Sequence, residues 1–116
     1  MQRIANRDAR NAAKCRMEFN GSNIFGRATA DGERYVVFDY GLHYPMYVWD
    51  SGQWYENGDG YSITTSKHHG QVRPVPNTLL MSTEAMQQLV AYGIAGVAVN
   101  EEVSEDIVAQ AIGGSI

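Results

Sequence analysis

The sequence predicts an α+β fold: an antiparallel β-meander of about five strands, packed on one face by one main helix in the C-terminal half. Short segments rich in aromatic and β-branched residues lie between residues 23 and 66, and turn residues separate them. An amphipathic stretch follows at residues 82–98. The length of 116 residues suits one domain with a single modest core.

Turn signals delimit the predicted strands. Asp31-Gly32 favours a type I′ hairpin, in which both central residues have positive φ, and Ser51-Gly52 is a second turn signal. Residues 33–40 carry consecutive apolar side chains, as a central strand with both faces covered would. Pro45 lacks an N–H, so we expect it at a strand start or on an edge. The expected strands are 23–30, 33–40, 44–50, 53–57 and 61–66.

The main helix is expected over residues 82–98, after an extended linker that contains Pro74 and Pro76. Apolar residues recur there at intervals of three and four, and Ser82 or Thr83 can cap the first turn. The helix can also stop at Gly93, so residues 94–99 are left open between helix and strand. A short capped helix is expected to end at Gly113.

The N-terminal residues 1–18 are predicted to form a basic arm or weak helix, and residues 19–116 a single α+β domain. The apolar stripe of the arm consists of alanines and offers little area for packing. Residues 1–27 carry six basic and two acidic side chains, a net charge of +4, whereas the remainder carries three and eleven, a net charge of −8. Such an arm can bind an anionic partner or fold back onto the acidic domain. General nucleic-acid binding is disfavoured, because nucleic-acid-binding domains are usually strongly basic.

The single cysteine, Cys15, excludes a disulfide framework and a multi-cysteine zinc site, which favours a reducing, intracellular setting. No apolar run approaches the roughly 18 residues of a membrane span, so no membrane partner is expected. The three histidines, His43, His68 and His69, lack the spacing of a metal site, and neighbours on a strand point to opposite faces. We therefore expect neither a metal nor another cofactor.

The polar segment "YSITTSKHHGQVRP", residues 61–74, is the main candidate for function. Its first interpretation is structural, as the end of a strand with Arg73 paired to an acid of the sheet. Recognition is a close second, because hydroxyls, cations and imidazoles can bind an anionic ligand or an acidic surface. Catalysis comes third: His68 could act as general acid or base in a metal-independent nuclease, with His43 as second proton carrier, but no carboxylate stands beside them in sequence. The candidate binding residues are Ser66, Lys67, His68, Arg73, Tyr40 and His43.

Residues 19–96 resemble a family of small, uncharacterised proteins encoded by tailed bacteriophages. The resemblance rests on the patterns "GSN-F", "YVV-SYG-H-P", an aromatic pair and "Y-TTSKH-Q-RP", which match Gly21, Ser22, Asn23, Phe25, Tyr35, Val36, Val37, Tyr40, Gly41, His43, Pro45, Trp54, Tyr55, Tyr61, Thr64, Thr65, Ser66, Lys67, His68, Gln71, Arg73 and Pro74. The chain departs from these patterns at Asp39, where serine is expected, and at His69, where a small polar residue is expected. The resemblance implies an origin but no activity.

The predicted function is that of a small phage accessory protein in the cytoplasm of the bacterial host. It would bind a host protein or a small anionic ligand, in counter-defence or host modulation, and it is expected to act without catalysis. One alternative is the metal-independent nuclease that uses His68. A second alternative is a minor virion or assembly component, which self-association into a homo-oligomer would favour.

Overall fold

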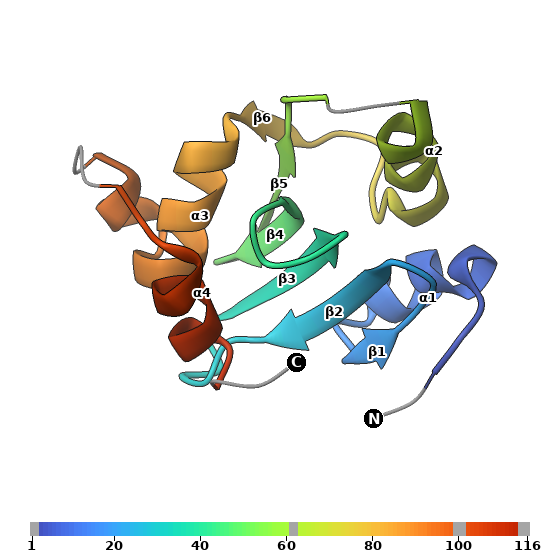
Figure 1. Cartoon of the computed structure of the whole chain (residues 1–116), viewed down its shortest axis with the longest axis horizontal. Coiled ribbons are helices and arrows are strands. Elements are labelled where there is room, and N and C mark those ends of the chain that lie inside the picture. Colours follow the sequence, from blue (N-terminus) through green and yellow to red (C-terminus); the bar gives the residue numbers. More distant parts are fainter. Residues whose placement is uncertain (1–2, 61–62, 99–101, 114–116) are drawn as a thin grey trace.

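The computed structural model describes residues 3–60, 63–98 and 102–113, and over these residues the predicted α+β class is confirmed. A six-stranded sheet lies between two groups of helices (Figure 1). The elements are the 3₁₀ helix η1 (Asn6–Asp8), α1 (Ala9–Lys14), β1 (Phe19–Asn20), β2 (Ile24–Ala28), β3 (Arg34–Asp39), β4 (Pro45–Asp50), β5 (Gln53–Asn57), α2 (Ile63–Val72), β6 (Leu79–Met81), α3 (Thr83–Tyr92), the 3₁₀ helix η2 (Ile94–Ala98) and α4 (Glu105–Ala111).

The strands lie in the sheet in chain order, and β1 to β5 are each antiparallel to their neighbours. The predicted meander is therefore present as β2 to β5. The edge strand β6 is parallel to β5, with Tyr55 opposite Leu79. A parallel pair needs a crossover connection, and α2 with the proline-containing loop after it supplies one.

The predicted strand at residues 61–66 is wrong. Residues 63–66 form the first part of α2, and residues 61–62 lie outside the described part of the chain. The structure adds two short edge strands, β1 and β6, that the sequence did not predict.

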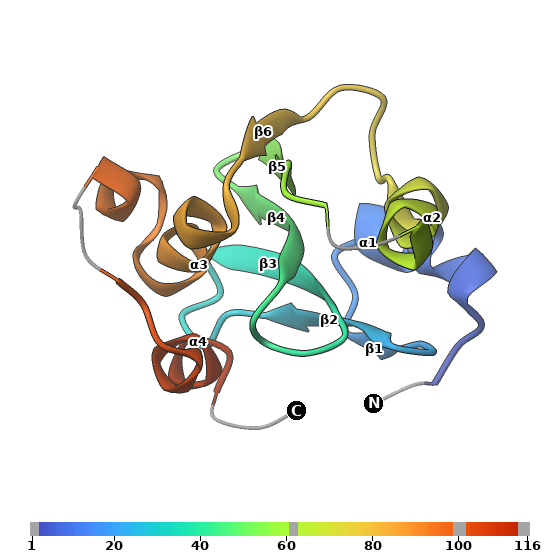
Figure 2. The same cartoon turned by 45° about the horizontal axis from the view of Figure 1, so that its top comes forward.

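The central strand β3 has buried side chains on both faces, as predicted for residues 33–40. Tyr35 and Val37 pack with α1 and α2, whereas Val36 and Phe38 pack with α3 and α4. Figure 2 shows the sheet between these two helix pairs. The single core expected from the sequence is thus two apolar layers, one on each face of the sheet.

The turns differ in detail from the prediction. Ser51 and Gly52 have φ of 52° and 83°, so the type I′ pattern of positive φ occurs there. At the predicted hairpin only Gly32 has positive φ, 74°, and the Asp31 carboxylate instead accepts hydrogen bonds from the Thr29 hydroxyl and the Glu33 N–H. Pro45 is the first residue of β4, as expected.

The main helix α3 is shorter than predicted. The Ser82 hydroxyl accepts a hydrogen bond from the Ala85 N–H at 3.2 Å and caps the first turn. Gly93, with φ of 82°, ends the helix, and residues 94–98 continue as the 3₁₀ helix η2 rather than as a strand. The predicted C-terminal helix is present as α4, capped by Ser104.

The N-terminal segment packs more closely than its alanine content indicates. Ala9 and Ala13 of α1 are fully buried and belong to the same core layer as Val72 of α2. Small side chains let two helices approach closely, so this stripe contributes to the core despite its limited area. The segment expected to be a basic arm or weak helix contains η1 and α1, and both lie beside α2 (Figures 1 and 2).

Candidate functional site

Helix α2 places the side chains of the polar segment. Its buried residues Thr65, His68 and Val72 recur at helical spacing, so one face of α2 packs on the sheet. The segment favoured a strand in the sequence because of its β-branched residues, but such propensities are weak and packing overrides them. Successive residues of a helix are about 100° apart. His68 and His69 therefore both reach the sheet instead of pointing to opposite faces.

Glu56 on β5 is the central acceptor of a buried polar group that we call the Glu56 cluster. The two Nη atoms of Arg73 donate to its two carboxylate oxygens at 2.9 and 3.0 Å. His69 Nδ1 lies 2.7 Å from Oε2, and the hydroxyls of Thr78 and Tyr47 donate at 2.6 and 3.1 Å. The expected pairing of Arg73 with an acid of the sheet is thus present in the structure.

The Glu56 carboxylate is held in its charged form. Burial raises the pKa of Glu56, but the hydrogen bonds from Thr78, His69 and Arg73 outweigh it, so the pKa lies below its ordinary value of 4.5. The cluster joins β5 to α2 and to the loop after it. We interpret the Glu56 cluster as structural rather than ligand-binding, because the hydrogen-bond donors around Glu56 are already bonded to it within the protein.

His68 forms a second buried pair, with Asp39 at the end of β3. Its Nδ1 lies 2.8 Å from Asp39 Oδ1, and the two residues are only 6% and 1% exposed. Asp39 Oδ2 has no hydrogen-bond partner among the described residues. Burial raises the pKa of Asp39, while the hydrogen bond with His68 acts in the opposite direction.

The carboxylate that the sequence did not place beside His68 is therefore Asp39. The two residues lie 29 positions apart, so no local spacing could indicate their contact. The Asp39 carboxylate lies where it can orient the imidazole of His68.

The other candidate residues are dispersed. Tyr40 is half exposed, and its ring lies over that of His68 with the centroids 5.6 Å apart. His43 lies beside α3 and α4, where its carbonyl accepts a hydrogen bond from Gln87 and its Nδ1 is 4.0 Å from Glu105. Ser66 and Lys67 are exposed on α2. The six candidate binding residues thus do not form one site.

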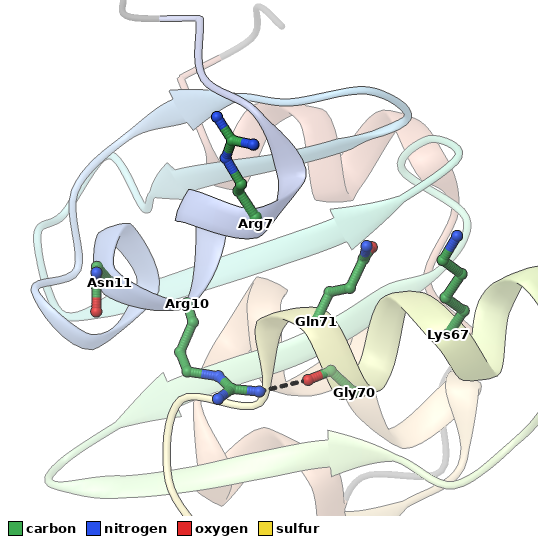
Figure 3. A pocket seen from close by; sticks show the side chains of 6 residues that line it. All are labelled: Arg7, Arg10, Asn11, Lys67, Gly70 and Gln71. Carbon is green, nitrogen blue, oxygen red and sulfur yellow. Dashed lines mark hydrogen bonds between the residues drawn. The ribbon is translucent and has the colours of Figure 1, made fainter.

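A hollow of about 590 Å³ lies between the N-terminal helices and α2 (Figure 3). Arg10 Nη2 donates to the Gly70 carbonyl at 2.6 Å and bridges its two walls. Lys67 and Gln71, four residues apart on α2, extend from the same side of that helix (Figure 3). We call this feature the basic hollow; it is lined by Arg7, Arg10, Asn11, Lys67, Gly70 and Gln71.

A second hollow, of about 260 Å³, adjoins the basic hollow and shares Arg10 with it. Its other lining residues are Lys14, Arg73, Pro74, Val75 and Pro76. Sequence reasoning identified Lys67 and Arg73 but missed the arginines of η1 and α1, although it recognised their segment as basic. The reason is distance along the chain, since Arg10 and Gly70 are 60 positions apart.

Metal ligands do not gather in the described part of the chain: residues 3–60, 63–98 and 102–113 contain no group of three or more histidine, cysteine or acidic side chains placed to hold an ion. Over the same residues, no helix has both the length and the apolar character needed to cross a membrane.

Comparisons with known proteins do not test the resemblance of the chain to the phage family, which stays a prediction. No protein-family model, no curated protein and no solved structure matches the chain.

Proposed function

We propose that this protein acts by binding an anionic partner, with the basic hollow as the contact surface. One observation carries the proposal: Arg7, Arg10 and Lys67 line the same hollow, and no carboxylate is among its lining residues. Three cations around one concave surface attract an anion and offer charge-assisted hydrogen bonds to it.

Two of these cations are available for a partner. Among the described residues, neither Arg7 nor Lys67 forms a hydrogen bond or an ion pair through its side chain, whereas Arg10 is held in place by Gly70. The chain carries a net charge of −4 and so has more acidic than basic side chains. Arg7 and Lys67 could therefore have been paired with acids of the protein itself, but within the described part of the chain they are not. An arrangement with one fixed cation and two free ones favours binding over internal pairing.

The biological setting of this proposal follows from the resemblance to phage proteins. We propose an accessory protein that acts in the bacterial host by counter-defence or host modulation. The anionic partner would be an acidic surface of a host protein or a small anionic ligand.

We expect Arg7→Glu to reduce partner recovery about tenfold or more, which corresponds to loss of one charge-assisted contact and addition of a repulsive charge. The tagged protein is incubated with a bacterial extract at low salt, and bound proteins and small anions are identified by mass spectrometry. Arg3→Glu is the matched control, because it makes the same charge change in the same segment outside the basic hollow. Equal recovery from all three proteins would contradict the proposal. Added salt should also release the partner.

A metal-independent nuclease that uses His68 is a second candidate function, because Asp39 supplies the orienting carboxylate that such a histidine needs. Against it, the His68 side chain is only 7% exposed, and Tyr40 lies over its ring. We therefore expect labelled RNA and DNA to remain intact when incubated with the purified protein.

The nuclease interpretation predicts the opposite result: cleavage that falls about 10²-fold or more in His68→Asn. Asparagine suits this test because its amide can donate a hydrogen bond to Asp39, so the buried carboxylate keeps a partner. Cleavage that survives unchanged in His68→Asn would show that His68 is not its catalytic residue, and cleavage lost in this variant would overturn the binding-only proposal.

A further inference from the structure

The size of the basic hollow suits a small molecule. Its volume of about 590 Å³ falls within the range of roughly 300–1,000 Å³ that is typical of small-molecule sites. The hollow is concave and bounded by helical segments on two sides, η1 with α1 and the last turns of α2 (Figure 3). A compact ligand that enters the hollow can contact residues of both helical segments.

The charge of the lining favours a phosphate group over a carboxylate. Arg7, Arg10 and Lys67 contribute three positive charges, and the lining contains no acid. A phosphate monoester carries about −1.5 to −2 charges at neutral pH and has three strong acceptor oxygens. A carboxylate carries one charge and two oxygens, so it would leave more of the lining uncompensated.

The uncharged part of the lining favours a ligand with hydroxyl groups. Gln71 contributes a side-chain amide to the lining, and its Oε1 has no hydrogen-bond partner among the described residues. A hydroxyl both donates and accepts, so it can bond to the Gln71 amide in either orientation of that amide. Asn11 is a further polar lining residue, and the lining contains no aromatic or aliphatic side chain on which a base or an acyl chain could pack.

From these three features we infer that the basic hollow binds a phosphate ester of a hydroxylated small molecule, such as a sugar phosphate. This inference rests on the proposed function and names the ligand class for the same surface. Arg7 and Lys67 bind the phosphate, with Arg10 held between the walls by Gly70. Gln71 bonds to a hydroxyl of the ligand.

Calorimetric titration of the full chain at low salt tests the inference with three probes: ribose 5-phosphate, inorganic phosphate and ribose. We expect ribose 5-phosphate to bind about tenfold more tightly than phosphate, because of the hydroxyl contact, and ribose to show no measurable binding. Lys67→Met should weaken the binding of both phosphorylated probes about tenfold or more. Gln71→Met, which keeps the length of the side chain, should lower only the affinity for ribose 5-phosphate, to that for phosphate.

Lys14→Met is the control, because it removes the same charge from the adjoining hollow and should leave the affinities unchanged within about twofold. Thermal melting of each variant shows whether it is folded. Equal affinity of the unmodified protein for ribose 5-phosphate and phosphate, or a Gln71→Met variant that retains the preference, would overturn the inference. If no probe binds while an anionic partner is still recovered from the extract through Arg7, the inference fails and the proposed function stands. If both experiments fail, both are wrong.

Discussion

Glu56→Ala is expected to lower the free energy of unfolding by about 3 kcal/mol. Glu56 is 5% exposed, and its carboxylate accepts hydrogen bonds from Arg73, His69, Thr78 and Tyr47. Alanine removes the shared acceptor, and each buried donor left without a partner costs about 1–3 kcal/mol. The Arg73 side chain is 39% exposed, so water can solvate part of its charge and the loss stays below the sum of these terms.

Urea denaturation of the unmodified protein and of Glu56→Ala measures this difference in the free energy of unfolding. Glu33→Ala is the matched control, because Glu33 is exposed and its replacement should change the free energy of unfolding by no more than about 0.5 kcal/mol. Glu56→Gln keeps the volume and part of the acceptor capacity, so its loss should lie between those of the other two variants. A loss for Glu56→Ala as small as that for the control would show that the Glu56 cluster does not stabilise the fold.

The Glu56 cluster also makes the stability of the protein depend on pH. The pKa of Glu56 is lower in the folded protein than its ordinary value of 4.5, so the folded state favours the carboxylate. The stabilisation is complete above the ordinary pKa and is lost as the pH falls through the lowered one. Between pH 7 and pH 3, Glu56→Gln should therefore lose less stability than the unmodified protein, whereas Glu33→Gln should follow the unmodified protein.

The elements that could be predicted from sequence are those with local signals. The strands expected at 33–40 and 53–57 match β3 and β5, because aromatic and β-branched runs end there at turn residues. Ser82 and Ser104 mark the starts of α3 and α4 for a similar reason: a capping hydroxyl acts on the turn that immediately follows it. Each of these signals lies within a few residues of the feature that it predicts.

Helix α2 and its contacts could not be predicted in this way. Its side chains are stabilised by residues of β3 and β5, at Asp39 and Glu56, far away along the chain. The parallel strand β6 depends on the same arrangement, since it reaches β5 only after α2 has crossed the sheet. The β-branched residues of this polar segment favour a strand locally, but its tertiary contacts stabilise a helix instead.

The basic hollow could be predicted from the sequence only in part. The excess of basic residues near the N-terminus was visible in the sequence, and two outcomes were left open: binding a partner, or folding back onto the domain. The structure contains folded-back cations, since Arg10 bonds to Gly70 and Arg16 stacks over Trp49. Arg7 lies in the same segment, and its side chain lines the hollow without a partner among the described residues. The outcome for each cation depends on its own tertiary contacts, which the local sequence does not specify.

Leu89→Ala is expected to lower the free energy of unfolding by about 2–5 kcal/mol, the range for a buried leucine. Leu89 is fully buried in α3 and belongs to the core layer formed with Val36, Phe38 and Val48 of the sheet. Helix α3 packs on β3, β4 and β5, so the cavity left by alanine would lie between helix and sheet. Both sides belong to regular elements that cannot easily move together to fill it, which places the expected loss in the upper part of the range.

Leu80→Ala makes the same chemical change at a residue that is 69% exposed on β6, and it should alter stability by no more than about 0.5 kcal/mol. Chemical denaturation of the two variants side by side therefore separates burial from side-chain identity. A small loss of stability for Leu89→Ala would mean that α3 does not cover the sheet in solution. The core layer described between α3 and the sheet would then be wrong. A large loss for Leu80→Ala would instead mean that the exposed edge strand is covered, as it would be if β6 packed against a second copy of the chain.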